Sequence, residues 1–200
     1  MPVKTDREYR ALSNFGVNEN EPYMVRGYAS TFEPYTLFSV DGVDYNERIE
    51  RGAFAGADMR DVVFLFNHEG QVMARSKNGT LEVGEDERGL WIRADLGTTA
   101  RSKEMYDEIR SGLIDQMSFA FVVDADGDHY ERDTHTRVIT RVKKVYDVSA
   151  VTYPANPDTT ISARSYFDGE IKKELEERQR AEERERRIRV LRLRLELDRK

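Results

Sequence analysis

Short apolar runs separated by turn residues recur along most of this chain, and their spacing predicts strands. Five consecutive apolar residues at 62–66 are typical of a strand buried on both faces. A second run, from Met117 to Val123, is apolar except for one serine. Tight-turn signals at Asn78-Gly79 and 86–89 have alternating strand patterns beside them. The pattern therefore predicts a β-rich chain.

Two segments depart from the strand pattern and predict helices. Thr98-Thr99 offers an N-cap for a helix that runs to Ile109, and Gly112 follows as a C-terminal signal. Residues 167–187 are rich in helix formers, with acidic and basic neighbours three and four positions apart and almost no apolar face. Residues 191–197 alternate with a period of two, but their Leu and Arg content favours continuation of this helix.

The organisation predicted from these patterns has three parts. Residues 1–22 are polar and weakly patterned, so we expect a flexible N-terminal arm. Residues 23–165 form a β-rich α+β domain, in which many short strands and few helices predict a closed or partly closed β-barrel with surrounding helices. Residues 166–200 form a charged helical tail, which is either solvated or bound to another molecule.

Composition and charge restrict the function. The 200 residues are 38% hydrophobic and 35% charged, so part of the chain is expected to stay outside any core. The net charge is −6, which argues against nucleic-acid binding, although residues 171–200 carry twelve basic and eight acidic side chains. The absence of cysteine excludes a thiol nucleophile, disulfides and thiolate metal sites. With no apolar stretch of about 18 residues and no signal-peptide core, we expect a cytoplasmic chain without a membrane partner.

Three polar residues with the chemistry of a serine hydrolase interrupt or end the apolar strands. His68 follows the run at 62–66, Ser118 lies inside the run that ends at Val123, and Asp147 lies within a later apolar strand. In such enzymes an imidazole removes the proton of a weakly nucleophilic hydroxyl, and a carboxylate orients the imidazole. A carboxylate in an apolar strand is costly unless it is paired. Together the three residues form a chemically complete set.

Each of these residues also has a structural interpretation. The histidine could be half-exposed at a strand end, and the serine could be a buried hydroxyl bonded to a carbonyl group. The aspartate could form an ion pair with a basic neighbour in the same stretch, namely Arg141, Lys143 or Lys144.

The other two histidines allow a metal site as an alternative. His129 and His135 flank Asp133 in a polar loop, and they could join His68 and Glu69 around a metal ion. The spacing matches no helical metal-binding motif, and either histidine could instead replace Asp147 as the third catalytic residue. No phosphate-binding glycine loop is present, so we expect neither a cofactor nor a metal.

At these residues the chain resembles the prohead (capsid maturation) proteases of tailed phages. The resemblance covers residues 23–163 and rests on four weak motifs in the family's order. They are Arg51-Gly52-Ala53-Phe54, Asn67-His68-Glu69, Gly112-Leu113-Ile114 leading into Met117-Ser118-Phe119-Ala120-Phe121, and the strand from Asp147 that ends in Pro154-Ala155-Asn156-Pro157.

The resemblance implies a serine endopeptidase related in fold to the herpesvirus assembly proteases. His68 would be the general base, Ser118 the nucleophile and Asp147 the third member, where the family more often has glutamate. Such a protease enters the procapsid in the host cytoplasm and cleaves the scaffold or the scaffold-like extension of the major capsid protein, and often itself. The resemblance therefore implies that the tail at 166–200 either docks on the scaffold or capsid protein or is a removable extension.

Two matters stay open at the level of the sequence. The first is a competing function, a non-enzymatic assembly factor that holds capsid subunits together, which would gain weight if Ser118 and His68 were too far apart to form a hydrogen bond. The second is the oligomeric state, for which a homo-oligomer is compatible with the sequence.

Overall fold

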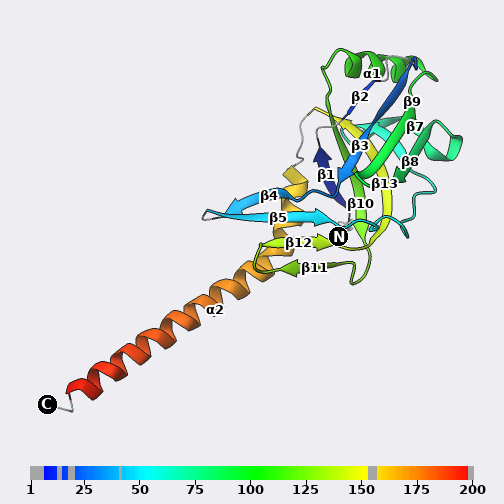
Figure 1. Ribbon diagram of the computed structural model, residues 1–200. Helices are drawn as coiled ribbons and strands as arrows, with labels where there is room; N and C mark the ends of the chain where they lie inside the picture. Colours follow the sequence, from blue (N-terminus) through cyan, green and yellow to red (C-terminus); the bar gives the residue numbers. More distant parts are fainter. Residues whose placement is uncertain (1–6, 13–14, 18–20, 41, 153–156, 198–200) are drawn as a thin grey trace, which may run out of the picture. The chain divides into compact units, whose positions relative to one another are not determined.

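The computed structural model describes residues 7–12, 15–17, 21–40, 42–152 and 157–197, and it divides the chain into two compact units. The first unit extends to Thr160, and the second comprises Ile161–Lys200. In the described residues the strands form three sheets (Figure 1).

The five-stranded sheet carries most of the chemistry-bearing residues. Its strands, in spatial order, are β1 (Glu8–Leu12), β10 (Gln116–Val123), β13 (Val142–Val151), β6 (Val63–Phe66) and β7 (Glu69–Arg75). The second sheet consists of β11 (Asp128–Glu131), β12 (Thr136–Ile139), β5 (Val43–Ile49) and β4 (Tyr35–Val40). The third consists of β2 (Phe15–Val17), β3 (Met24–Thr31), β9 (Gly89–Asp95) and β8 (Leu81–Glu85), and a short 3₁₀ helix, η1 (Ser76–Asn78), precedes β8.

The prediction of a β-rich chain with few helices is confirmed, but the prediction of a closed or partly closed barrel is not supported. Among the described strands, each of the three sheets is open and has two edge strands. Alternating apolar and polar residues locate strands, whereas closure depends on which distant strands pair. In this chain β10 pairs with β1 and β13, and β13 pairs in parallel with β6, across long sequence separations.

Strand β10 is the centre of the packing. Met117, Phe119 and Phe121 are fully buried, and the rings of Phe119 and Phe121 stack at 4.7 Å between centroids. The run at 62–66 is predicted to be buried on both faces, but only Val62 and Phe64 are buried, and the other three residues are half-buried. A short apolar run does not reveal how many of its faces are covered. Strands β10, β12 and β13 contain consecutive buried residues and are therefore covered on both faces.

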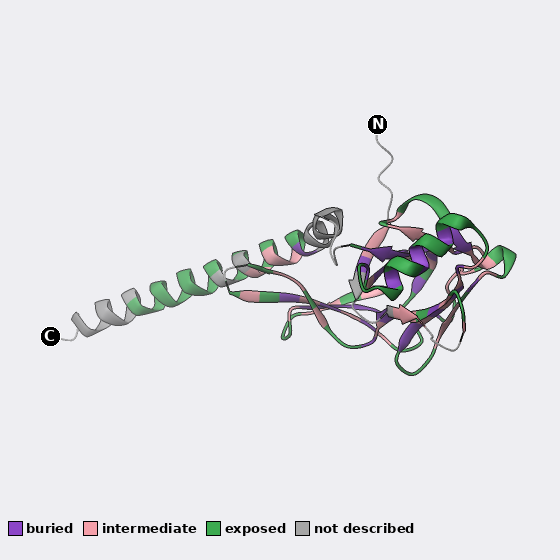
Figure 2. Cartoon of the chain, turned by 90° about the horizontal axis from the view of Figure 1, so that it is seen from above, coloured by how far each residue is buried: buried purple, intermediate pink, exposed green. Residues whose placement is uncertain are grey.

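Helix α1 (Ala100–Arg110) confirms the predicted helix and its signals. Thr99 caps the helix by accepting a hydrogen bond from the backbone of Ser102, and Gly112 follows the end with a φ of +76°. The buried positions Ser102, Met105, Tyr106 and Ile109 recur every three or four residues, so one face packs on the core and the other is exposed (Figure 2). The helix brings the chain back to the start of β10.

The N-terminal segment differs from the flexible arm that the sequence predicts. β1 pairs with β10, and β2 pairs with β3, so residues 8–12 and 15–17 belong to the sheets. The charges of Glu8 and Arg10 made this segment look solvated. Their partners, Glu47 and Arg137, lie far away in the sequence, and a local pattern cannot reveal them.

A buried ion cluster attaches β1 to the second sheet. Glu47 is fully buried and accepts hydrogen bonds from Arg10, from Arg137 Nη1 at 3.1 Å, and from the hydroxyl of Tyr35. Glu8 accepts a hydrogen bond from Arg137 Nη2 at 2.9 Å. Burial raises the pKa of Glu8, but the hydrogen bond from Arg137 and the charge of Arg10 outweigh burial and bring this pKa below its ordinary value. Burial and the negative charge of Glu47 raise the pKa of Tyr35 well above its ordinary value.

Glu47→Gln is expected to destabilise the fold by about 3–5 kcal/mol, because it removes the fully buried one of the two carboxylates that pair with the guanidinium groups of Arg10 and Arg137. Urea unfolding followed by circular dichroism measures this loss. Asp61→Asn is the matched control, since Asp61 pairs with Arg75 at 2.6 Å but is 38% exposed, and it is expected to cost less than about 1 kcal/mol. Equal losses in the two variants would contradict a dominant role for the buried cluster.

Helix α2 (Pro157–Leu197) confirms the predicted helical tail, including the alternating stretch. The described side chains from residue 179 to residue 189 are all exposed (Figure 2). Pairs of opposite charge one turn apart support the helix, among them Glu170 with Lys173 and Glu176 with Arg180. Among the described helices, none has the length and apolar character needed to cross a membrane.

Candidate active site

Ser118 is presented by β10, in which the residues from Met117 to Phe121 are all buried. Its neighbours Met117 and Phe119 point to the opposite face of the sheet and anchor the strand in the core. Ser118 itself is 4% exposed and lies directly opposite Ser149 of β13 in the antiparallel register. The hydroxyl is therefore held rigidly, and a rigid nucleophile loses little entropy on reaching the reacting geometry.

His68 lies in the tight turn between β6 and β7. Asn67 and His68 are the two central residues of this turn and have φ angles of +49° and +61°, as a two-residue hairpin of the type I′ kind requires. Asn67 tolerates this conformation and also secures the turn. Its backbone N–H donates to Ala150 O at 2.9 Å, and its side-chain oxygen accepts from Thr152 N at 3.1 Å. The turn is thus tied to the end of β13.

Asp147 is delivered by β13, the strand between β10 and β6. The parallel pairing aligns Asp147 with Val63 and Ala150 with Phe66, so the turn that follows Phe66 lies at the same end of the sheet as Ser149. Asp147 is 4% exposed, and the three strands bring its carboxylate, the imidazole of His68 and the hydroxyl of Ser118 to one place.

The three side chains form a continuous chain of hydrogen bonds. His68 Nε2 lies 2.7 Å from Ser118 Oγ, and His68 Nδ1 lies 2.6 Å from Asp147 Oδ1. Because an ionised carboxylate only accepts hydrogen bonds, the ring proton belongs on Nδ1, and Nε2 is free to accept the proton of the Ser118 hydroxyl. The geometry is that of a general base, its orienting acid and a hydroxyl nucleophile.

Two further residues contact the imidazole of His68. The ring of Tyr9, on β1, meets the imidazole edge-on at 4.6 Å between centroids. Ser149 Oγ lies 2.8 Å from Asp147 Oδ1 and 3.2 Å from His68 Nδ1. We did not identify Ser149 from the sequence, although a signal was present, since residues two apart on a strand share a face and Ser149 follows Asp147 by two.

The remaining candidates of the metal alternative lie elsewhere. His129 is on β11, 3.9 Å from Glu131, and His135 Nδ1 is 2.9 Å from the hydroxyl of Tyr130. Both histidines are thus engaged within the second sheet, whereas His68 is at the end of the five-stranded sheet. In the described part of the chain, no three metal-ligating side chains gather in a group that could hold an ion.

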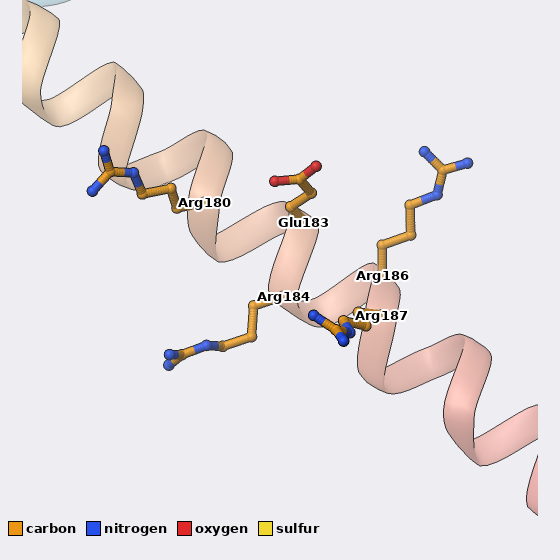
Figure 3. Close-up of a pocket in the computed structure, with 5 residues that line it drawn as sticks. All are labelled: Arg180, Glu183, Arg184, Arg186 and Arg187. Atoms are coloured by element: carbon orange, nitrogen blue, oxygen red, sulfur yellow. The ribbon is translucent and has the colours of Figure 1, made fainter.

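A charged hollow lies along α2. Its lining residues come from two turns of a single helix (Figure 3). They are Arg180, Glu183, Arg184, Arg186 and Arg187. None of them provides a nucleophile, and they carry an excess of positive charge. This hollow is therefore a feature of the tail's surface and not a catalytic pocket.

The fold and the site together define a chain with a serine hydrolase arrangement built on a β-sheet. The family model of the caudovirus prohead serine protease matches residues 9–174, a range that contains all three site residues. The chain belongs to this family. The prohead protease of Enterobacteria phage HK97 is 30% identical over 148 residues, which are 72% of this chain and 60% of that relative. The chain therefore spans about 60% of the length of that relative. The search of solved structures found none that matches this chain.

Proposed function

We propose that this chain is a serine endopeptidase that acts in phage prohead maturation. The observation that carries the proposal is the hydrogen-bonded series Ser118–His68–Asp147, with links of 2.7 and 2.6 Å. The family match supports a protease of this kind. A non-enzymatic assembly factor would not need a hydroxyl, an imidazole and a carboxylate in this order, and the Ser118–His68 distance gives that alternative no support.

The proposed reaction proceeds through an acyl-enzyme. Ser118 Oγ attacks the scissile carbonyl carbon while its proton passes to His68 Nε2. When the tetrahedral intermediate collapses, the C–N bond breaks and the leaving amine takes the proton from Nε2. A water molecule then gives a proton to Nε2 and attacks the ester, which releases the acid and restores the Ser118 hydroxyl. Asp147 stabilises the imidazolium through Nδ1–H at each stage.

The proposed substrates are the scaffold protein or the scaffold-like extension of the major capsid protein, and also the chain itself. The proposed place of action is the interior of the procapsid in the host cytoplasm. We also propose a kinship in fold with the herpesvirus assembly proteases, which an experimental structure of this chain would test.

The activity can be tested without knowledge of the cleavage site. A fluorophosphonate probe reacts with an activated serine, because the Oγ–P bond forms, the P–F bond breaks and the serine proton passes to the base. We expect one phosphonyl group per chain, located at Ser118 by peptide mass spectrometry. Co-production with the capsid protein of the same phage should then yield cleaved capsid protein. An unmodified Ser118 in folded protein would overturn the proposal.

We further propose that α2 is a docking arm for an acidic partner in the assembling capsid. Arg180, Arg184 and Arg187 recur at helical spacing, so they share one side of the helix, and all three are exposed (Figure 3). The opposite side mixes Glu182 and Glu185 with basic residues. The stripe of three arginines lies beyond residue 174, where the family match ends. The guanidinium groups of such a stripe are suited to pairing with carboxylates.

Reversing two charges of the stripe, Arg184→Glu with Arg187→Glu, is expected to reduce co-assembly with the capsid protein at least about tenfold, because each new carboxylate repels an acidic partner. The rate of fluorophosphonate labelling should not change. Arg186→Glu with Arg189→Glu makes the same change in charge on the other side of the helix and serves as the control. Quantitative mass spectrometry of purified proheads measures incorporation. Equal incorporation of both double variants would contradict a face-specific contact.

A further inference from the structure

Ser149 is a fully buried polar residue next to the proposed catalytic residues. It follows Asp147 by two positions on β13, so its side chain leaves the sheet on the same face. It also lies directly opposite Ser118 in the register of β10 and β13. The strand pairing thus places a second hydroxyl beside the nucleophile, with no exposed surface of its own.

The contacts of Ser149 are with the acid and the base. Its hydroxyl donates to Asp147 Oδ1 at 2.8 Å, which directs the lone pairs of Oγ towards His68 Nδ1 at 3.2 Å. In the described part of the chain, the side-chain donors to Asp147 are therefore His68 and Ser149. A buried carboxylate with fewer donors is costly and free to rotate, so the second donor restricts the carboxylate to one orientation.

The same contacts exclude Ser149 as a second nucleophile in this arrangement. Its proton is engaged by a carboxylate, whereas the proton of Ser118 faces the unprotonated nitrogen Nε2. Ser149 is 0% exposed, so a peptide carbonyl has no direct approach to it. Its chemistry is restricted to holding its two neighbours.

We propose that Ser149 is a positioning residue, which orients the carboxylate of Asp147 and holds the proton of His68 on Nδ1 so that Nε2 faces Ser118. This inference rests on the proposed function and assigns a fourth member to the same site. In metal sites, outer groups that orient a ligating imidazole contribute about 10- to 100-fold, and we expect an effect of that order for a group that orients the Asp147–His68 pair.

Ser149→Thr and Ser149→Val form the matched pair that tests the proposal, because they add nearly the same volume and differ in the hydroxyl. We expect Ser149→Thr to label with the fluorophosphonate probe at close to the wild-type rate. Ser149→Val is expected to label roughly 10- to 100-fold more slowly, as the loss of a hydrogen bond to a charged group implies. Equal rates in Thr and Val variants that are both folded would overturn the positioning role.

A spectroscopic measurement separates positioning from a packing effect. The proton on His68 Nδ1 should give a low-field NMR signal in the wild type and in Ser149→Thr, and this signal should broaden or vanish in Ser149→Val. If both β-branched variants unfold, Ser149→Ala tests the positioning role instead, since this substitution adds no volume to the buried site. A wild-type labelling rate and an unchanged Nδ1–H signal in Ser149→Ala would overturn the proposal.

The outcomes distinguish this inference from the proposed function. If the folded wild-type chain is not labelled at Ser118, the proposed function fails. If the wild type is labelled and the Ser149 variants label equally well, only the positioning role fails.

Discussion

Ser118→Ala is expected to give a folded chain that takes up no fluorophosphonate and leaves the capsid protein uncleaved. Without Oγ there is no nucleophile for the acyl-enzyme, and removal of a catalytic serine lowers turnover by about 10⁶-fold. The fold should lose only about 1 kcal/mol, because the change removes one hydroxyl from a strand anchored by its apolar neighbours. Probe labelling, thermal unfolding and electrophoresis of the co-produced capsid protein measure the three effects.

Ser30→Ala is the control for this substitution. Ser30 is likewise a buried strand serine, at 1% exposure, but its hydroxyl bonds to the carbonyl of Thr31 rather than to an imidazole. It should therefore label at the wild-type rate. Capsid cleavage that persists in Ser118→Ala would remove Ser118 from the nucleophile's role, and labelling lost equally in Ser30→Ala would indicate a folding defect.

Asp147→Asn is expected to lower the labelling rate and the rate of peptide cleavage by about 10⁴-fold while the fold is retained. An amide at this position has no charge to stabilise the imidazolium. Its NH₂ group can also donate to Nδ1, which moves the ring proton to Nε2 and blocks proton uptake from Ser118. Stopped-flow labelling over a range of pH values measures the loss.

Asp128→Asn is a suitable comparison for the aspartate. Asp128 also lies in a strand and pairs with a buried guanidinium, that of Arg137 at 2.6 Å, but it belongs to the second sheet. Its replacement should leave the rate unchanged and lower stability. If Asp147→Asn retained a rate within tenfold of the wild type, Asp147 would not be the third member of the site.

The candidate residues could be selected from the sequence because each interrupts or ends an apolar strand. A serine, a histidine and an aspartate in such places are costly to bury, so they attract attention without knowledge of the fold. Ser149 was not predicted as a site residue, because Ser118, His68 and Asp147 already formed a complete catalytic set. Only its contacts with Asp147 and His68 distinguish it from an ordinary buried hydroxyl.

The N-terminal segment shows the opposite difficulty. Its charged residues predict a solvated arm, whereas in the fold Arg10 is paired with Glu47 across 37 positions and is nearly fully buried. Composition reports the average cost of burying a charge, and a distant partner offsets part of that cost. The same limit explains why the prediction of a closed or partly closed barrel is not supported, since strand patterns along the sequence do not show which strand edges remain unpaired.

The local patterns along the chain were enough to predict many of the strands, the capped helix α1, the helical tail and a set of residues with hydrolase chemistry. Periodicity and capping depend on neighbours within a few positions, so the local sequence is enough to predict these features. The meeting of Ser118, His68 and Asp147 depends on the pairing of β10 with β13, on the parallel pairing of β13 with β6, and on a turn with positive φ angles. These are long-range choices of register, and a shift of one residue would turn Ser118 to the opposite face.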